Sequence, residues 1–256
     1  MDLKLSVEVA KKYSSSSQQI RVMTEHWVNR SVFCPNCGER LNRFENNQPV
    51  ADFYSGSCSE EYELKSKNGI FGKKVIDGAY STMVERLQAN NNPNFFFLTY
   101  SNNTLEIKDF LAIPKYFFIE EIIEKRNPLS VSARRAGWIG CNIIMGSIPE
   151  FGKIFYVQNG VTQNKSRVLE KWNKTTFIRN TQDVEAKGWI FDVLVCIEKL
   201  KKKDFSLDEL YKFEPLLKAK HPLNNNVQAK IRQQLQFLRD RNVLEFVNPG
   251  KYRLKS

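Results

Sequence analysis

The apolar run at residues 94–100, NFFFLTY, limits the possible folds of this chain more than any other stretch. A short, dense apolar run of this kind is typical of a buried strand. The run DFLAIP at 109–114 has the same character, and KIFYVQNG at 153–160 predicts another strand, which ends in an Asn-Gly turn. Because helical patterns lie between these strands, we expect an α/β (α+β) core with a mixed sheet.

Other segments of this core have weaker patterns. We expect helices at 15–30, 80–89, 119–125 and 166–173, a tight knuckle at 33–40, a basic, glycine-bearing loop at 133–142 and a β-like segment at 175–180. These elements form a first domain, residues 1–183. After it the pattern of mixed strands and helices gives way to three helices and a hairpin.

The sequence pattern of the second domain, residues 184–256, predicts a winged helix-turn-helix. Helices are expected at 189–200, 206–218 and 226–242, with Ser206 as an N-cap and Glu209 at the capping-box position. Two alternating strands follow around Asn248-Pro249-Gly250. Three helices and a basic hairpin are typical of a DNA-binding winged helix.

The charge of the chain favours a polyanionic partner. Lys and Arg number 39 against 28 Asp and Glu, a formal net charge of +11 over 256 residues. From Glu198 to Ser256 there are 14 Lys or Arg and 7 Asp or Glu, so this stretch carries +7 of the total. A basic surface of this kind indicates nucleic acid or, less often, an anionic membrane.

The sequence pattern also bears on location. We expect no secretion signal and no membrane span, and therefore a cytoplasmic protein without a membrane partner. The chain has five Cys, an odd number that includes a C-x2-C pair. In a reducing compartment this pattern favours free thiols and metal binding over a disulfide framework.

Asp52, Glu63 and Lys65 form the candidate catalytic group. If 60–66 is a strand, its period of two places Glu63 and Lys65 on one face and Tyr62 and Leu64 on the other. Phosphodiester cleavage needs a metal to polarise the phosphate, an activated water and a positive group. The alternative is an exposed strand face with an ordinary Glu–Lys pair.

These residues suit a magnesium nuclease. Mg²⁺ prefers hard oxygen ligands, which Asp52 and Glu63 would supply together with the main-chain carbonyl of Leu64. Lys65 would orient the attacking water or stabilise the transition state. Residues and spacing alone predict a basic, metal-dependent nuclease.

The stretch from Pro49 to Lys65, PVAD-x10-E-x-K, resembles the PD-(D/E)xK nuclease signature, with Val50 and Ala51 inserted between Pro49 and Asp52. Further blocks are CPNC, EYELKSK, NNPNFFFLTY, ARRAGWIGCN, IRQQLQFLRD and GKYR. Together they resemble the DpnI-like family of methyl-directed (type IIM) restriction endonucleases over essentially the whole chain.

The resemblance implies a PD-(D/E)xK core with a C-terminal winged helix. It also implies that Asp52, Glu63 and Lys65 are the nuclease residues, that Mg²⁺ is the cofactor, and that both domains contact DNA with methylated adenine in GATC. No partner methyltransferase is required, and we expect a monomer in solution. The alternative from another class is a methyl-adenine DNA-binding regulator with an inactive nuclease fold. A repair or structure-specific nuclease is a third hypothesis.

A possible zinc site departs from the usual pattern. Cys34 and Cys37 are followed, at the spacing of a zinc ribbon, by Ser55 and Cys58. Serine is a poor zinc ligand, so a four-thiolate site is not available. Three thiolates with water or His26 could hold zinc, and the alternative is a metal-free turn with packed thiols.

Basic and aromatic residues supply the candidate DNA contacts. Trp138 follows two arginines in a glycine loop and would present a flat apolar surface to the adenine methyl groups, the alternative being a core tryptophan flanked by surface charge. The candidates for DNA binding are Lys67, Lys73, Arg134, Arg135 and Trp138 in the first domain, and Lys230, Arg232, Gln233, Lys251 and Arg253 in the second.

Overall fold

The large sheet is built around a strand that has no solvent-exposed face. In the computed structural model, which describes residues 1–45, 51–89, 91–181 and 183–255, β5 (Asn94–Tyr100) is buried along its whole length. Phe96 and Leu98 belong to the main core, and Phe95 packs on the opposite side against Phe118, with 4.6 Å between the ring centres. The predicted buried strand is therefore confirmed.

The described residues contain seven strands in the large sheet. Its spatial order is β1 (Leu41–Arg43), β2 (Phe53–Ser55), β3 (Glu61–Asn68), β5, β6 (Ile107–Ile113), β9 (Ile154–Gln158) and β10 (Val161–Thr162). β3 and β5 are parallel, whereas the other neighbours are antiparallel, so the sheet is mixed as expected.

Two long helices pack on one face of this sheet. α1 (Ser16–Ser31) supplies Trp27 to the core, and α3 (Lys165–Thr175) supplies Trp172. The indole ring of Trp27 contacts Phe110 edge to face, with 5.2 Å between the ring centres. Aromatic side chains bury large apolar areas, so these contacts hold the helices to the sheet.

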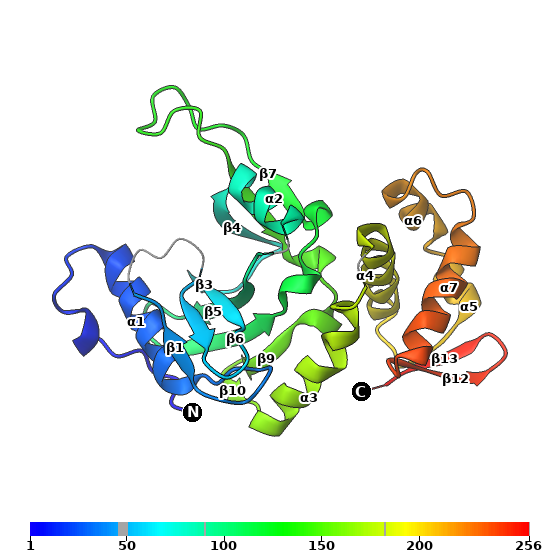
Figure 1. Ribbon diagram of the computed structural model, residues 1–256, viewed down its shortest axis with the longest axis horizontal. Coiled ribbons are helices and arrows are strands. Elements are labelled where there is room, and N and C mark those ends of the chain that lie inside the picture. Colours follow the sequence, from blue (N-terminus) through cyan, green and yellow to red (C-terminus); the bar gives the residue numbers. More distant parts are fainter. Residues whose placement is uncertain (46–50, 90, 182, 256) are drawn as a thin grey trace. The chain divides into compact units, whose positions relative to one another are not determined.

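A second, smaller sheet lies beside α2 (Tyr80–Gln88). Its order is β4 (Lys74–Ala79), β8 (Gly140–Ile144) and β7 (Ile123–Lys125), all antiparallel. The segment between β7 and β8 extends away from this sheet as a long arm (Figure 1). Main-chain hydrogen bonds hold the two sides of this arm together, including one from Leu129 N to Trp138 O at 2.9 Å.

Short 3-10 helices connect these elements. They are η1 (Glu8–Ala10), η2 (Lys115–Phe117), η3 (Glu120–Ile122), η4 (Met145–Ser147), η5 (Glu150–Gly152) and η6 (Thr176–Ile178).

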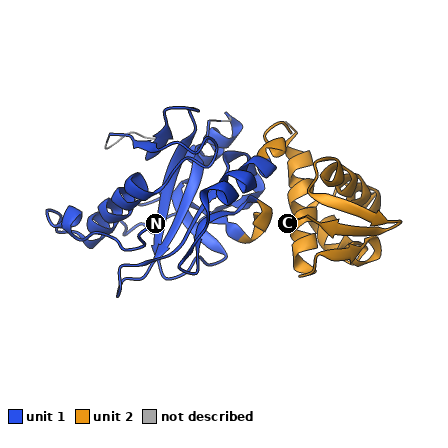
Figure 2. Ribbon diagram, turned by 90° about the horizontal axis from the view of Figure 1, so that it is seen from below, with its two compact units in different colours: residues 1–145, 152–175 blue, residues 146–151, 176–256 orange. Residues whose placement is uncertain are grey.

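The chain divides into two compact units (Figure 2). Residues 1–145 and 152–175 form the first, and residues 146–151 and 176–256 form the second. The second unit contains α4 (Val184–Lys199), β11 (Asp204–Ser206), α5 (Leu207–Tyr211), α6 (Glu214–Lys220), α7 (Val227–Asp240), β12 (Leu244–Asn248) and β13 (Lys251–Leu254). Its strands pair in the order β11-β13-β12, which completes a winged helix-turn-helix.

Local sequence signals account for the helices of this unit. The capping box is present: Ser206 Oγ accepts a hydrogen bond from Glu209 N, and the Glu209 side chain accepts one from Ser206 N. Leu235 and Leu238, on one face of α7, are fully buried, whereas Arg232 lies on its exposed face.

Three predicted elements are wrong. Residues 119–125, where a helix is expected, instead form η3 and β7, because Ile123 pairs with Ile143 of β8. The β-like segment at 175–180 is the end of α3 followed by η6. The single helix at 206–218 is two helices, since Pro215 cannot donate a main-chain hydrogen bond and lies in the first turn of α6.

The predicted loop at 133–142 ends in a strand, because Gly140 begins β8. Among the helices of the described residues, none combines the length and the apolar character that a membrane crossing requires.

Candidate active site

The pairing of β2 with β3 places Asp52 beside the middle of β3. Asp52 N donates to Tyr62 O at 2.9 Å, which aligns the residue just before β2 with the neighbouring strand. The Asp52 carboxylate then accepts a hydrogen bond from Leu64 N at 2.7 Å. The side chain of Asp52 therefore faces the segment that carries Glu63 and Lys65.

The alternation predicted for β3 is present. Tyr62 is fully buried and stacks on Phe96, with 4.4 Å between the ring centres and 8° between the planes. Glu63 and Lys65 point to the opposite face, where their side chains are 25% and 19% exposed. Lys65 Nζ donates to Glu63 Oε1 at 2.5 Å. The three predicted residues thus lie close together.

A third carboxylate, which the sequence analysis missed, enters the same site. Asp77 of β4 accepts a hydrogen bond from Lys65 Nζ, so the ammonium group lies between Glu63 and Asp77. The signal was available in the strand pattern, because Asp77 shares a face with the buried Val75. An acid on the apolar face of a strand is rarely solvated and needs a partner.

Burial makes the ionised forms of the two predicted acids unfavourable. Burial raises the pKa of Asp52, and the hydrogen bond from Leu64 N only partly opposes this. Burial also raises the pKa of Glu63, although Lys65 acts in the opposite direction. Burial lowers the pKa of Lys65, but the negative charges of Glu63 and Asp77 raise it by more than burial lowers it. The pKa of Lys65 is therefore raised overall. Lys65 is therefore charged.

A buried acid on α1, Glu25, adds negative charge near Asp52. Glu25 is 3% exposed and is paired with Arg21 at 2.5 Å and with Arg43. Arg21 also lies 3.9 Å from Asp52, so it links the two acids. The charge of Glu25 raises the pKa of Asp52, which adds to the effect of burial.

The donor set of this site fits a divalent cation. Asp52 and Glu63 provide two partly buried carboxylates, and the main-chain carbonyl of Leu64 lies between Glu63 and Lys65 in sequence. A hard cation among them would offset the cost of burying negative charge, and Mg²⁺ takes such ligands. Pro49 of the sequence signature lies outside the described residues.

The thiols of Cys34, Cys37 and Cys58 come together at the knuckle that precedes β1. Their sulfur atoms lie within 4.8 Å of one another, and among the described residues no histidine or acid joins this group. Ser55 Oγ lies 3.3 Å from Cys37 Sγ, at the position where a fourth ligand would be needed. The predicted cluster is therefore present, and His26 is not part of it.

The local environments of the thiols differ. Burial raises the pKa of Cys34 to about 12. Burial acts in the same direction on Cys58, but hydrogen bonds with Asn36, Ser55, the Glu60 main chain and Cys34 together outweigh it and lower the pKa to about 7. Cys141 and Cys196 are buried, as expected for small apolar residues.

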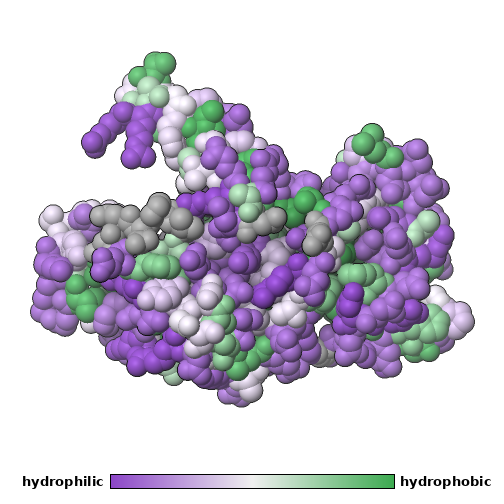
Figure 3. Space-filling view, viewed as in Figure 1, coloured by the Kyte–Doolittle hydropathy of each residue, from purple (hydrophilic) through white to green (hydrophobic). Residues whose placement is uncertain are grey.

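The basic candidates of the first unit are exposed. Lys67 lies near the end of β3, and Lys73 lies just before β4. Arg134 and Arg135 lie in the arm between β7 and β8, which carries hydrophilic side chains and an apolar tip (Figure 3). Trp138 is partly buried at the base of this arm, where its ring covers Gly140.

The basic candidates of the second unit lie on α7 and the wing. Gln233 and Arg232 are exposed on α7, and Arg232 Nη1 donates to the Tyr211 hydroxyl at 2.6 Å. Lys251 is exposed at the start of β13, whereas Arg253 donates to Asp204 Oδ1 at 2.7 Å. Lys230 is partly exposed.

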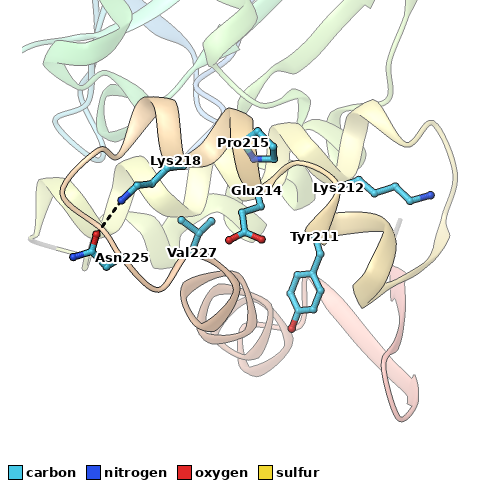
Figure 4. A pocket seen from close by; sticks show the side chains of 7 residues that line it. All are labelled: Tyr211, Lys212, Glu214, Pro215, Lys218, Asn225 and Val227. Carbon is cyan, nitrogen blue, oxygen red and sulfur yellow. Dashed lines mark hydrogen bonds between the residues drawn. The ribbon is translucent and has the colours of Figure 1, made fainter.

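A surface pocket lies next to the start of α7 (Figure 4). Its lining residues are Tyr211, Lys212, Glu214, Pro215, Lys218, Asn225 and Val227. Lys218 Nζ donates to Asn225 Oδ1 at 3.1 Å and to Asn224 O at 2.6 Å. This lysine therefore holds the turn that leads into α7.

Comparison with known protein families gives matches over nearly the whole chain. Residues 1–181 match DpnI, described as the Dam-replacing family. Residues 185–254 match DpnI_C, described as the Dam-replacing HTH domain.

We expect Asp52→Asn to stabilise the metal-free protein at pH 7, by about 1 kcal/mol in urea unfolding. The folded-state pKa of Asp52 is raised, so the wild type loses stability as the pH rises through that pKa, and the variant does not. The difference should vanish below about pH 3, under the unfolded pKa, because Asp52 is then protonated in both the folded and the unfolded protein.

Glu124→Gln is the matched control for this prediction. A hydrogen bond from Lys74 lowers the pKa of Glu124, so removing its charge should not stabilise the protein at pH 7. An Asp52→Asn variant that is less stable than the wild type at pH 7 would contradict the expectation.

Proposed function

Since the chain belongs to the DpnI, or Dam-replacing, family, we propose that it is a methylation-dependent type II restriction endonuclease. It hydrolyses phosphodiester bonds of double-stranded DNA at GATC in which the adenine is methylated. The observation that carries the proposal is the convergence of Asp52, Glu63 and Lys65 at one partly buried site. The helix-turn-helix domain indicates DNA as the partner.

The first unit acts in this proposal as a PD-(D/E)xK nuclease. Asp52, Glu63 and the carbonyl of Leu64 would hold Mg²⁺, which when bound polarises the phosphate and lowers the pKa of the attacking water. Lys65 would place a positive charge at the scissile phosphate, because its ammonium group remains protonated within hydrogen-bonding distance of Glu63. Partial burial excludes bulk water and strengthens these interactions.

The DNA is held by both units. Lys67, Lys73, Arg134 and Arg135 contact backbone phosphates, which suits their exposure and the net charge of +11. Trp138 presents an apolar surface to the adenine methyl groups.

The second unit adds a second sensor of the same site. Lys230, Arg232 and Gln233 of α7 lie in the major groove, and Lys251 and Arg253 meet phosphates beside the wing. Arg253 must then exchange Asp204 for a phosphate. The protein acts as a cytoplasmic monomer, and a host without this adenine methylation needs no partner methyltransferase.

The thiol cluster would bind zinc only weakly. Cys34, Cys37 and Cys58 offer three thiolates, and the fourth position faces Ser55, whose hydroxyl is a poor ligand. Water would complete the coordination. We therefore propose a structural zinc site of low or labile occupancy.

The central test offers Mg²⁺ and plasmid from hosts with and without adenine methylation. We expect cutting of the methylated plasmid alone, and a rate about 100- to 1,000-fold lower for Lys65→Ala, because a charge at the reacting phosphate is lost. Gel analysis of the plasmid forms measures both results. Binding to methylated DNA without cutting would support instead a regulator with an inactive nuclease fold.

We expect Trp138→Ala to reduce the preference for methylated over unmethylated sites more than it reduces turnover. A methyl contact is worth about 10-fold or more in discrimination. Cleavage rates on matched duplexes with and without the methyl groups give the ratio. Equal loss on both duplexes would reject a role of Trp138 in methyl reading.

Ser55→Cys should convert the thiol cluster into a tight zinc site. A fourth thiolate completes the tetrahedral set, so about one zinc per chain should survive chelator washing. Elemental analysis of the washed wild type should show little zinc. Stoichiometric zinc in the washed wild type would contradict the proposed weak site.

A further inference from the structure

Asp77 brings a carboxylate from the small sheet into the candidate active site. Its side chain is 7% exposed and accepts a hydrogen bond from Lys65 Nζ. The same oxygen, Oδ1, accepts from Gly78 N at 2.7 Å, which orients the carboxylate. Asp77 is outside the sequence signature, because it lies 12 residues beyond Lys65 on a strand of another sheet.

The strand geometry is irregular at this residue. The pairing of β4 with β8 shifts register between Asp77 and Ala79, as a β-bulge or a similar irregularity does. Bulges re-aim side chains and occur often beside active sites. The neighbour Ile76 is 66% exposed, whereas Asp77 turns inward to Lys65.

The two acids that contact Lys65 differ in their roles. In the proposed function Glu63 also holds the cation, and a cation at Glu63 repels the ammonium group of Lys65. The hydrogen bond to Asp77 does not compete with metal binding in this way. Asp77 can therefore retain Lys65 at the site when Glu63 is engaged.

We propose that Asp77 is a positioning residue for Lys65, which it holds beside the scissile phosphate. The inference rests on the proposed nuclease function and extends it to a residue of the small sheet. An acid near DNA phosphates weakens binding, so a role in DNA affinity predicts the opposite sign from a role in cleavage.

The test is Asp77→Asn in the full chain, with plasmid carrying adenine-methylated GATC. Single-turnover cleavage in Mg²⁺ should be about 100-fold slower, because a small displacement of a reacting group costs about this much. The affinity for the same DNA, measured without divalent metal, should be unchanged or tighter. A purely structural role would not separate these two quantities.

Glu124→Gln is again the matched control, because Glu124 is another acid of the small sheet that pairs with a lysine, Lys74, but its side chain is 35% exposed. It should cut like the wild type. Wild-type cleavage by Asp77→Asn would overturn the proposal, as would equal slowing by Glu124→Gln or a loss of affinity as large as the loss of rate.

The test also covers a variant that does not fold and a wild type that does not cut. If Asp77→Asn does not fold in thermal unfolding, Asp77→Glu serves instead. It keeps the charge but moves the oxygen, so slower cleavage with retained affinity supports the proposal, and wild-type cleavage overturns it. A wild type that binds methylated DNA without cutting it overturns the proposed function, and with it the role of Asp77, before any variant is compared.

Discussion

The stacking of Tyr62 on Phe96 is the contact on which the candidate site depends. It holds one side chain of β3 in the core, with 4.4 Å between the ring centres. Since successive side chains of a strand point to opposite faces, Glu63 and Lys65 must then point the other way. The Tyr62 hydroxyl also contacts Cys34 Sγ at 3.1 Å, so the same residue joins β3 to the thiol cluster.

The opposite face of β3 gathers negative charge in a protein that is otherwise basic. Glu63 and Asp77 contact Lys65, and Asp52 accepts a hydrogen bond from the neighbouring Leu64 N. Burial raises the pKa of Asp52 and of Glu63. Raised pKa values in a partly buried cluster of charged groups are typical of sites for binding and catalysis. The net charge of the whole chain, +11, favours association with the polyanion on which this site would act.

Sequence patterns were reliable where one physical signal dominated. The apolar run of β5 and the capping box at Ser206 are confirmed because burial and capping act locally. The predicted helix at 119–125 is wrong because its isoleucines also suit a strand, and pairing with β8 favours the strand. Asp77 was missed because the sequence analysis assigns no strand to residues 74–79, and because its partner Lys65 belongs to a different sheet.

The sequence by itself determined the class of fold and the winged helix, and the period of β3 predicted that Glu63 and Lys65 share a face opposite Tyr62, because period records which face of an element each side chain takes. Only the tertiary structure decided which side chains from separate elements meet. It brought Asp77 to Lys65 and placed Ser55 beside Cys37. Contacts between distant segments depend on the packing of whole sheets, and no local pattern encodes that packing.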